Sequence, residues 1–479
     1  MFFNLENDIS KKIVFLLIFF FFLIIAINNQ FPEGSFFASG DNYQIINFDN
    51  YFEKKFGIWE YSQAGRVNNS YYSFFYYKFI AFLFFISNIS ETYSSVILNF
   101  TYLFFSFLSF YYSLNFLKIK ITFTNKILIS ICYSINFFVF YIFWYTWGYT
   151  TTIFYYIFAP ILLSAFFSYT TEQNYKNKLK ILITIIPIIF LSNLSFGNIA
   201  WLLINLLIYS IIFLFHIFPN LRILKIKNIL IETSFFLIFI LIFLIFTFIS
   251  IYINFLSIED SSISYSLNTD DLFNWLFWQS QPLPGAFFFI RHYLSVNTLN
   301  NLQYLTIVNF IFIFYLFYKI KDWNYLNKIY LSILIILVLT TFKGIYYLPS
   351  PIIKYFFGET FFYSFRSEDK ASLLLPYFCF TIIAFYISKL ENKKNIIPVL
   401  LLIINILSSY PLITGGFHRD HGINIDKIIN SEFKGLKSID KDLLEIQNIL
   451  DEEDNHRIYN VLEAPYSVTA SLGWSDFSG

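Results

Sequence analysis

An aspartate follows the first long apolar run of the chain, where it could lie at a membrane surface. The apolar run covers residues 13–28, and Asp41 lies in the stretch SGDNYQIINFD, residues 39–49. A carboxylate held near a membrane can act as a general base that removes the proton of an acceptor hydroxyl as a sugar carbon on a lipid phosphate is attacked. The same residue type also caps helices or lies in solvated loops. Position and residue type alone therefore leave both readings of Asp41 open.

A basic pair precedes a later apolar run. Arg366 and Lys370 lie four residues apart in FRSEDK, before the run that begins near Leu373. On one face of a helix they could neutralise a phosphate, the arginine as a bidentate fork and the lysine as a point charge. Basic residues at a membrane interface also extend toward lipid head groups without any further role. Glu359, upstream of the pair, is either a second carboxylate of a site or a solvated loop acid.

Two further polar pairs are weaker candidates. Arg291 and His292, in FFFIRHYL, border an apolar stretch, where anchoring to head groups is favoured over catalysis. His418 and His421 have a spacing that a metal ion could use, but no third ligand is evident in the sequence.

The composition is that of a membrane protein. Hydrophobic residues make up 57% of the 479 residues and charged residues 13%, whereas soluble domains carry about 25% charged residues. The net charge of +1 excludes a strong basic field, and with it a nucleic-acid partner. Cys132 and Cys379 lie inside apolar runs, so no disulfide framework or zinc site is indicated. The fold class is therefore an all-α polytopic membrane protein.

Runs of about twenty apolar residues, the length that crosses a bilayer as a helix, predict about eleven transmembrane helices. The first run follows Lys11 and Lys12 and lacks a small-residue cleavage site, so we interpret it as a retained helix rather than a signal peptide. The approximate centres of the predicted helices are residues 20, 105, 137, 160, 187, 208, 242, 311, 336, 380 and 405.

The linkers between these runs fall into two classes. The short linkers are basic and are predicted to be cytoplasmic by the positive-inside rule; they carry Lys118/Lys120/Lys126, Lys176/Lys178/Lys180, Arg222/Lys225/Lys227, Lys319/Lys321/Lys328 and Lys389/Lys393/Lys394. The long linkers hold most acidic residues and are predicted to lie outside; they cover residues 29–93, 255–302, 343–370 and 415–479. The chain is thus expected to be a multi-pass cell-membrane protein with a cytoplasmic N-terminus and an extracytoplasmic C-terminus. Residues 73–89 are expected to lie along the outer surface.

Two domains are predicted. Residues 1–414 form the transmembrane domain, with a long first extracytoplasmic loop at 29–93. Residues 415–479 contain a charged helical pattern, a turn and an apolar strand pattern, and are expected to begin a soluble extracytoplasmic α/β domain, either very small or truncated.

The motifs of the first loop resemble those of a known enzyme family. In order they are Asp41, the FDNYF stretch at residues 48–52, Trp59-Glu60, Gly65, and Asn69 with Tyr71-Tyr72. This order is similar to that of the membrane α-(1→3)-arabinofuranosyltransferases of the mycobacterial cell wall, in their N-terminal C-type glycosyltransferase (GT-C) domain. The family has proline where this chain has Asn50, aspartate where it has Glu60, and glycine where it has Tyr72.

Later pieces follow the family's order. They are FGNIA around Asn198, FRSEDKASLLLP at residues 365–376, and NHRIYNVLEAPYSVTASLGW at residues 455–474. The resemblance thus extends over nearly the whole chain, and its motifs lie on the side predicted to be outside.

The resemblance implies a GT-C fold and an inverting transfer of a sugar from a polyprenyl-phosphate donor to a glycan. It implies that Asp41 is catalytic and that Arg366 and Lys370 bind the donor phosphate, with Asp49 in a structural role. The sugar, the acceptor and the choice between a polyprenyl and a dolichyl lipid stay open. Some relatives use a divalent cation, Mg²⁺ or Mn²⁺, but no ligand set can be read in this chain.

Two rival functions remain at this point. One is an oligosaccharyltransferase-like enzyme, which GWSDFSG at residues 473–479 faintly resembles. The other is a non-catalytic exporter or assembly protein for lipid-linked glycans. An enzyme needs Asp41, whereas an exporter would tolerate Asp41→Asn.

Overall fold

The computed structural model describes the helical part of the chain and five short strands. The described residues are 9–30, 35–39, 42–43, 59–60, 66–67, 91–136, 150–193, 199–220, 226–258, 305, 307–319, 325–340, 373–389, 396–414 and 435–438. The predicted surface segment at residues 73–89 lies outside them, as do residues 259–302 and 343–370 of the predicted outer loops and all of 415–479 except one strand.

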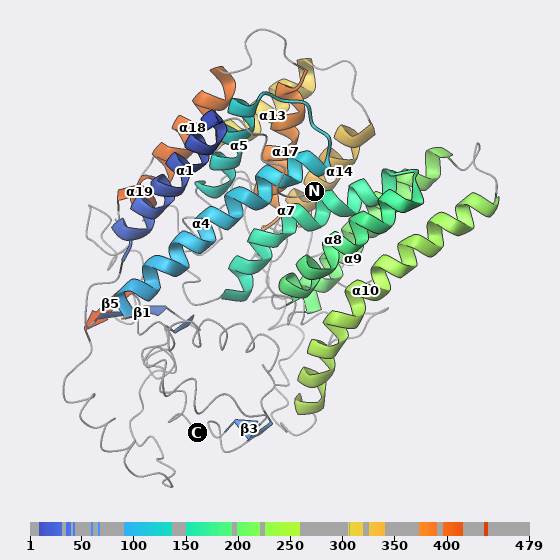
Figure 1. Ribbon diagram of the computed structural model, residues 1–479, viewed down its shortest axis with the longest axis horizontal. Helices are drawn as coiled ribbons and strands as arrows, with labels where there is room; N and C mark the ends of the chain where they lie inside the picture. Colours follow the sequence, from blue (N-terminus) through green and yellow to red (C-terminus); the bar gives the residue numbers. More distant parts are fainter. Residues whose placement is uncertain are drawn as a thin grey trace.

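The helices of this part form an apolar bundle (Figure 1). They are α1 (Ile9–Asn28), α4 (Glu91–Phe116), α5 (Phe123–Ser134), α7 (Thr150–Thr171), α8 (Tyr175–Asn193), α9 (Ile199–Asn220), α10 (Ile226–Ile258), α13 (Ile307–Lys319), α14 (Tyr325–Thr340), α17 (Leu375–Ile387), α18 (Ile396–Ser408) and α19 (Tyr410–Thr414). The sequence dictates helices here because backbone groups in an apolar environment must bond within their own segment. The described part is mainly helical and apolar, as expected of a helical membrane protein.

Most of the predicted helix centres fall inside these helices. The exception is residue 137, which lies beyond the end of α5 and outside the described residues. Among the described residues, one helix, Ser10–Asn28, is by itself long and apolar enough to cross a membrane. Shorter apolar stretches are Ile204–Ile217, Ile229–Ile245, Leu375–Ile387 and Ile396–Ser408. The number of eleven transmembrane helices is therefore not confirmed and stays a prediction.

The centre and the surface of the bundle differ in burial. Every residue of α17 is buried, and Pro376 stands in its first turn, where a missing N–H breaks no helical bond. In contrast, α1 exposes an apolar face that includes Leu16, Leu17 and Ile24, while it buries Phe22 and Ile25. A helix buried on all sides belongs in a core, and an exposed apolar stripe is what a lipid-facing helix presents.

The strands form two small sheets. β1 (Ser35–Ser39) lies between β2 (Asn42–Tyr43) and β5 (Gly435–Ser438), and both pairings are antiparallel. β3 (Trp59–Glu60) pairs with β4 (Arg66–Val67). In Figure 1 the labels β1 and β5 stand side by side below the lower ends of α1 and α4.

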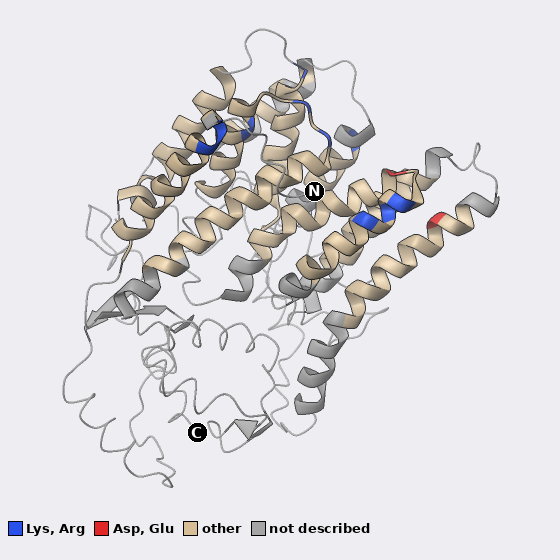
Figure 2. Cartoon of the chain, in the orientation of Figure 1, with Lys and Arg blue, Asp and Glu red and all other residues tan. Residues whose placement is uncertain are grey.

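The basic residues of the described helices gather toward the other end of the bundle. The blue segments of Figure 2 lie in the upper part of the view, away from the strands labelled β1, β5 and β3 in Figure 1. Several lysines that were predicted to lie in linkers lie inside helices instead: Lys126 in the first turn of α5, Lys176, Lys178 and Lys180 at the start of α8, Lys227 in α10, Lys319 in α13 and Lys328 in α14. Lys126 is buried because its Nζ donates to Asn115 Oδ1 and lies 3.9 Å from the centroid of the Tyr111 ring. The Tyr111 ring and the Asn115 amide accommodate the ammonium group of a lysine that was predicted to lie in a cytoplasmic linker.

A pair of tyrosines joins α5 to α7 through each other's carbonyls. Tyr133 Oη donates to the Tyr156 carbonyl and Tyr156 Oη to the Tyr133 carbonyl, both at 2.7 Å, and the two rings are stacked at 4.6 Å. Pro160, four residues after Tyr156, has no N–H to offer that carbonyl. The Tyr133 carbonyl lies in the last turn of α5, where intrahelical donors run out. The Tyr133 hydroxyl therefore bonds a carbonyl that Pro160 cannot serve, and the Tyr133 carbonyl accepts both from Tyr156 Oη and, at 2.7 Å, from Asn136 Nδ2.

Removal of the Tyr133 hydroxyl is expected to destabilise the protein by about 1–3 kcal/mol, because Tyr133→Phe removes a buried hydrogen bond to the Tyr156 carbonyl. In a Pro160→Ala background the same change should cost less, since residue 160 then supplies an N–H to that carbonyl. Denaturant unfolding of the four chains in detergent measures the coupling. Equal costs in the two backgrounds would contradict this account of the tyrosine pair.

Candidate functional site

The three residues with predicted roles in catalysis and phosphate binding, Asp41, Arg366 and Lys370, lie outside the described residues. The same holds for most of the supporting candidates: Asp49, Asn198, Arg291, His292 and Glu359. Trp59 and Glu60 are described as strand β3. The structure therefore describes the frame that surrounds the predicted site, and the predicted roles of these residues stay predictions.

The segments on both sides of Asp41 belong to one sheet. β1 ends at Ser39 and β2 begins at Asn42, and these two residues are Cα partners in the antiparallel register. On its other side β1 pairs with β5, from Ser35 opposite Ser438 to Ala38 opposite Gly435. A segment of the first loop and a segment near the C-terminus thus meet directly before the predicted base.

The second sheet pairs two short segments of the first loop. Glu60 of β3 and Arg66 of β4 are Cα partners, next to the pair Trp59 and Val67. Glu60, predicted to support the site, is thus part of a local hairpin within the first loop.

Amide side chains join the helix ends next to the β1–β5 sheet. Asn29 is 3% exposed and donates from Nδ2 to the Leu412 carbonyl of α19, and Asn28 Nδ2 donates to the Ile413 carbonyl at 2.9 Å. Asn99 of α4 donates to the Asn29 carbonyl at 3.2 Å. α19 has five residues, so carbonyls in its last turn lack donors within the helix. These bonds fix α1, α4 and α19 to one another.

Sequence reasoning missed these amides. They are lone asparagines within or at the ends of apolar runs, the one signal that could have marked them, since an amide in an apolar run must find partners inside the protein. A second example joins α13 to α18: Asn309 and Asn405, both fully buried, bond to each other reciprocally at 3.3 Å.

Several buried tyrosines of the described part have hydrogen-bonded hydroxyls, whereas the buried Tyr209 hydroxyl has no hydrogen-bond partner there. The Tyr155 hydroxyl accepts from Asn205 Nδ2 at 2.6 Å, and the hydroxyls of Tyr330 and Tyr377 are 2.8 Å apart. This packing places these four side chains in the core of the described part. These groups are neutral hydroxyls and amides that already bond to protein partners. Their role is therefore structural, because they hold helices together.

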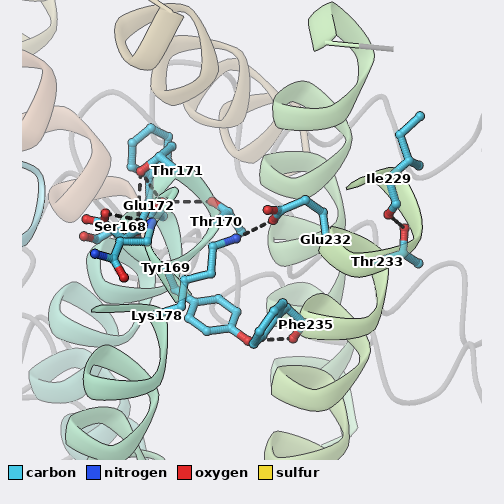
Figure 3. Close-up of polar contacts among 12 residues, drawn as sticks. Ser168, Tyr169, Thr170, Thr171, Glu172, Lys178, Ile229, Glu232, Thr233 and Phe235 are labelled. Atoms are coloured by element: carbon cyan, nitrogen blue, oxygen red, sulfur yellow. Dashed lines mark hydrogen bonds and ion pairs between the residues drawn. The ribbon is translucent and has the colours of Figure 1, made fainter. Parts of the chain in front are cut away.

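One buried pair of charges was a further candidate for a site (Figure 3). Lys178 Nζ bonds to Glu232 Oε2, and the side chain of Lys178 is 1% exposed. The ammonium group lies 5.5 Å from the centroid of the Phe235 ring and 5.8 Å from that of Tyr169, whose hydroxyl donates to the Phe235 carbonyl at 2.8 Å. The lysine charge is thus neutralised and covered within the protein. The pair acts as a link between α8 and α10 rather than as a binding site.

Within the described residues, no group of three or more His, Cys, Asp or Glu side chains could hold a metal ion. The two cysteines are buried and free.

Loss of the Glu232 charge is expected to destabilise the protein by about 3–5 kcal/mol, because Glu232→Gln leaves the buried Lys178 ammonium without its counter-charge. The exposed pair Lys118–Glu172, at 3.5 Å, is the matched control, and Glu172→Gln should cost less than about 1 kcal/mol. Denaturant unfolding in detergent measures both variants. Similar costs for the buried and the exposed pair would show that the Lys178–Glu232 contact does not hold α10 to the bundle.

Comparisons with known proteins give one structural relative. No protein-family model matches the chain, and no curated protein matches its sequence. The arabinofuranosyltransferase AftD from Mycobacteria, solved by single-particle cryo-EM, is similar in structure with a TM-score of 0.54 and 11% sequence identity. The match covers 95% of this chain and 30% of AftD. At this identity the likeness concerns the fold: this chain shares the fold of part of a mycobacterial arabinofuranosyltransferase.

Proposed function

We propose that the protein is a membrane glycosyltransferase of the arabinofuranosyltransferase-like GT-C type. It transfers a sugar from a polyprenyl-phosphate or dolichyl-phosphate donor to a cell-surface glycan or glycoprotein, with inversion, at the outer face of the membrane. The similarity of fold to AftD over 95% of the chain carries this proposal. The order of the loop motifs, from Asp41 to Trp59-Glu60 and on to the basic pair, supports it independently.

The proposed topology has about eleven membrane crossings, a cytoplasmic N-terminus and an extracytoplasmic C-terminus. The position of the lysines of the described helices supports it, since those drawn blue in Figure 2 lie toward the end of the bundle that is remote from the strands. The strands that flank Asp41 would then lie outside, in the predicted extracytoplasmic loop 29–93. A donor carried by a membrane lipid and a water-soluble acceptor can meet at this surface.

In the proposed reaction the phosphate of the donor is held by Arg366 and Lys370, which stabilise the negative charge that develops on it as it leaves. Asp41 removes the proton of the acceptor hydroxyl. The hydroxyl oxygen forms the new glycosidic bond on one face of the sugar carbon while the bond to the phosphate oxygen breaks on the other. The configuration at that carbon is therefore inverted, and the lipid phosphate leaves with the bonding electrons.

The supporting residues have lesser roles in this scheme. Asp49 shapes the loop, and Trp59 and Glu60 belong to the β3–β4 hairpin within it. Asn198, Arg291, His292 and Glu359 border the proposed site in the predicted order of outer segments. A divalent cation would assist by sharing the donor phosphate.

The proposal is tested by transfer of radiolabelled sugar from polyprenyl-phosphate donors in membranes that contain each variant. Asp41→Asn is expected to lower the transfer rate by at least about 100-fold, the scale of a lost general base. Arg366→Ala should raise the KM for the donor and lower kcat. Glu53→Gln, a carboxylate of the same loop without an assigned role, is the matched control and should retain transfer.

Folding of each variant is checked by size exclusion in detergent. Undiminished transfer by well-folded Asp41→Asn would move the base to another residue. Absence of transfer by the unmodified chain with every donor tested would instead favour an exporter or assembly role.

A further inference from the structure

The central strand of the β2-β1-β5 sheet depends on a segment from the far end of the chain. β1 has two Cα partners in β2 and four in β5. A two-stranded hairpin alone is at best marginally stable in water, whereas a third strand adds a second row of backbone hydrogen bonds. β5 is therefore the larger source of order for the strand that directly precedes Gly40 and Asp41.

Contacts between the end of α1 and α19 bring the segments that lead to β1 and β5 close together. β1 and β5 are about 400 residues apart in sequence, and pairing strands across such a loop costs conformational entropy. The bonds from Asn28 and Asn29 to the carbonyls of Ile413 and Leu412 bring the two connecting segments to one point. From there the chain has only residues 30–34 before β1 and residues 415–434 before β5.

We propose that β5 and the Asn29 link are a positioning element for the first outer loop, so that the C-terminal segment takes part in the function of the transmembrane domain. Asn29 is a positioning residue: its amide fixes α19 against α1, and β5 then pairs with β1 and orders it. The inference that this loop does chemistry rests on the proposed function, whereas the pairing and its dependence on Asn29 do not.

Disulfide trapping tests the pairing in the full-length chain without any assay of activity. Ser35→Cys and Ser438→Cys place thiols at Cα partner positions, and the native thiols Cys132 and Cys379 are buried. The in-register pair should cross-link in membranes at least about tenfold faster than the offset control, Ser35→Cys with Leu436→Cys, because disulfide geometry tolerates little separation. Equal rates for the two pairs would overturn the proposal.

The role of Asn29 is tested in the same chains. Asn29→Ala removes a buried hydrogen bond and should slow the in-register cross-linking roughly tenfold. Asn309→Ala removes a buried amide of the bundle at α13 and α18 and should leave the rate unchanged, which separates a specific link from general loosening. Cross-linking that is unaffected by Asn29→Ala would overturn the positioning role.

Sugar transfer provides the functional arm. Asn29→Ala should lower transfer about tenfold, and formation of the Ser35–Ser438 disulfide link in that variant should restore it, because the covalent bond replaces the lost constraint. Failure of the disulfide to restore transfer in a chain whose unmodified form is active would contradict the proposal. Cross-linking as expected in a chain that transfers no sugar would refute the proposed function and leave the dependence of the sheet on Asn29 standing.

Discussion

A backbone carbonyl without a donor is costly in an apolar bundle, and this constraint explains how several helices of the described part are joined. The Tyr156 carbonyl, which Pro160 cannot serve, accepts from the Tyr133 hydroxyl, and the Tyr133 carbonyl at the end of α5 accepts from the Tyr156 hydroxyl and the Asn136 amide. At the end of α19 the donor is the Asn29 amide. The bonds from the two tyrosines and from Asn29 each satisfy a backbone carbonyl and also join two helices. The same hydrogen bonds therefore determine which helices lie next to each other.

The residues that hold the bundle together differ from the residues that are predicted to be reactive. The interior links are neutral hydroxyls and amides, and the buried charge of Lys178 is neutralised by Glu232. The groups with predicted reactivity are predicted to lie in loops that the bundle carries, and loops on a rigid scaffold often hold functional residues. In the proposed transferase the bundle therefore supports the β2-β1-β5 sheet of the first loop at one end. The lysines of the described helices lie toward the other end.

The helices were the most predictable part of the fold, because apolar runs such as those centred at residues 160 and 242 satisfy their backbone groups within a helix, and these two runs coincide with α7 and α10. The position of α5 was less predictable, because Lys126 has the sequence character of a linker residue. The contacts with the Tyr111 ring and the Asn115 amide that bury it cannot be read from the sequence. The pairing of β1 with β5 could not be predicted, because four residue pairs about 400 positions apart leave no local pattern. For the candidate site, the loops were identified from the order of their motifs. The asparagine amides that join the helix ends next to these loops belong to no sequence motif.

The most direct test of the account is the sidedness of the reaction. Right-side-out and inverted membrane vesicles containing the protein would be loaded with a labelled polyprenyl-phosphate sugar and given a membrane-impermeant glycan acceptor. The account predicts transfer to the acceptor added to right-side-out vesicles and none to acceptor added to intact inverted vesicles. Transfer confined to the inverted vesicles would contradict a reaction at the outer face, on the side of the β2-β1-β5 sheet.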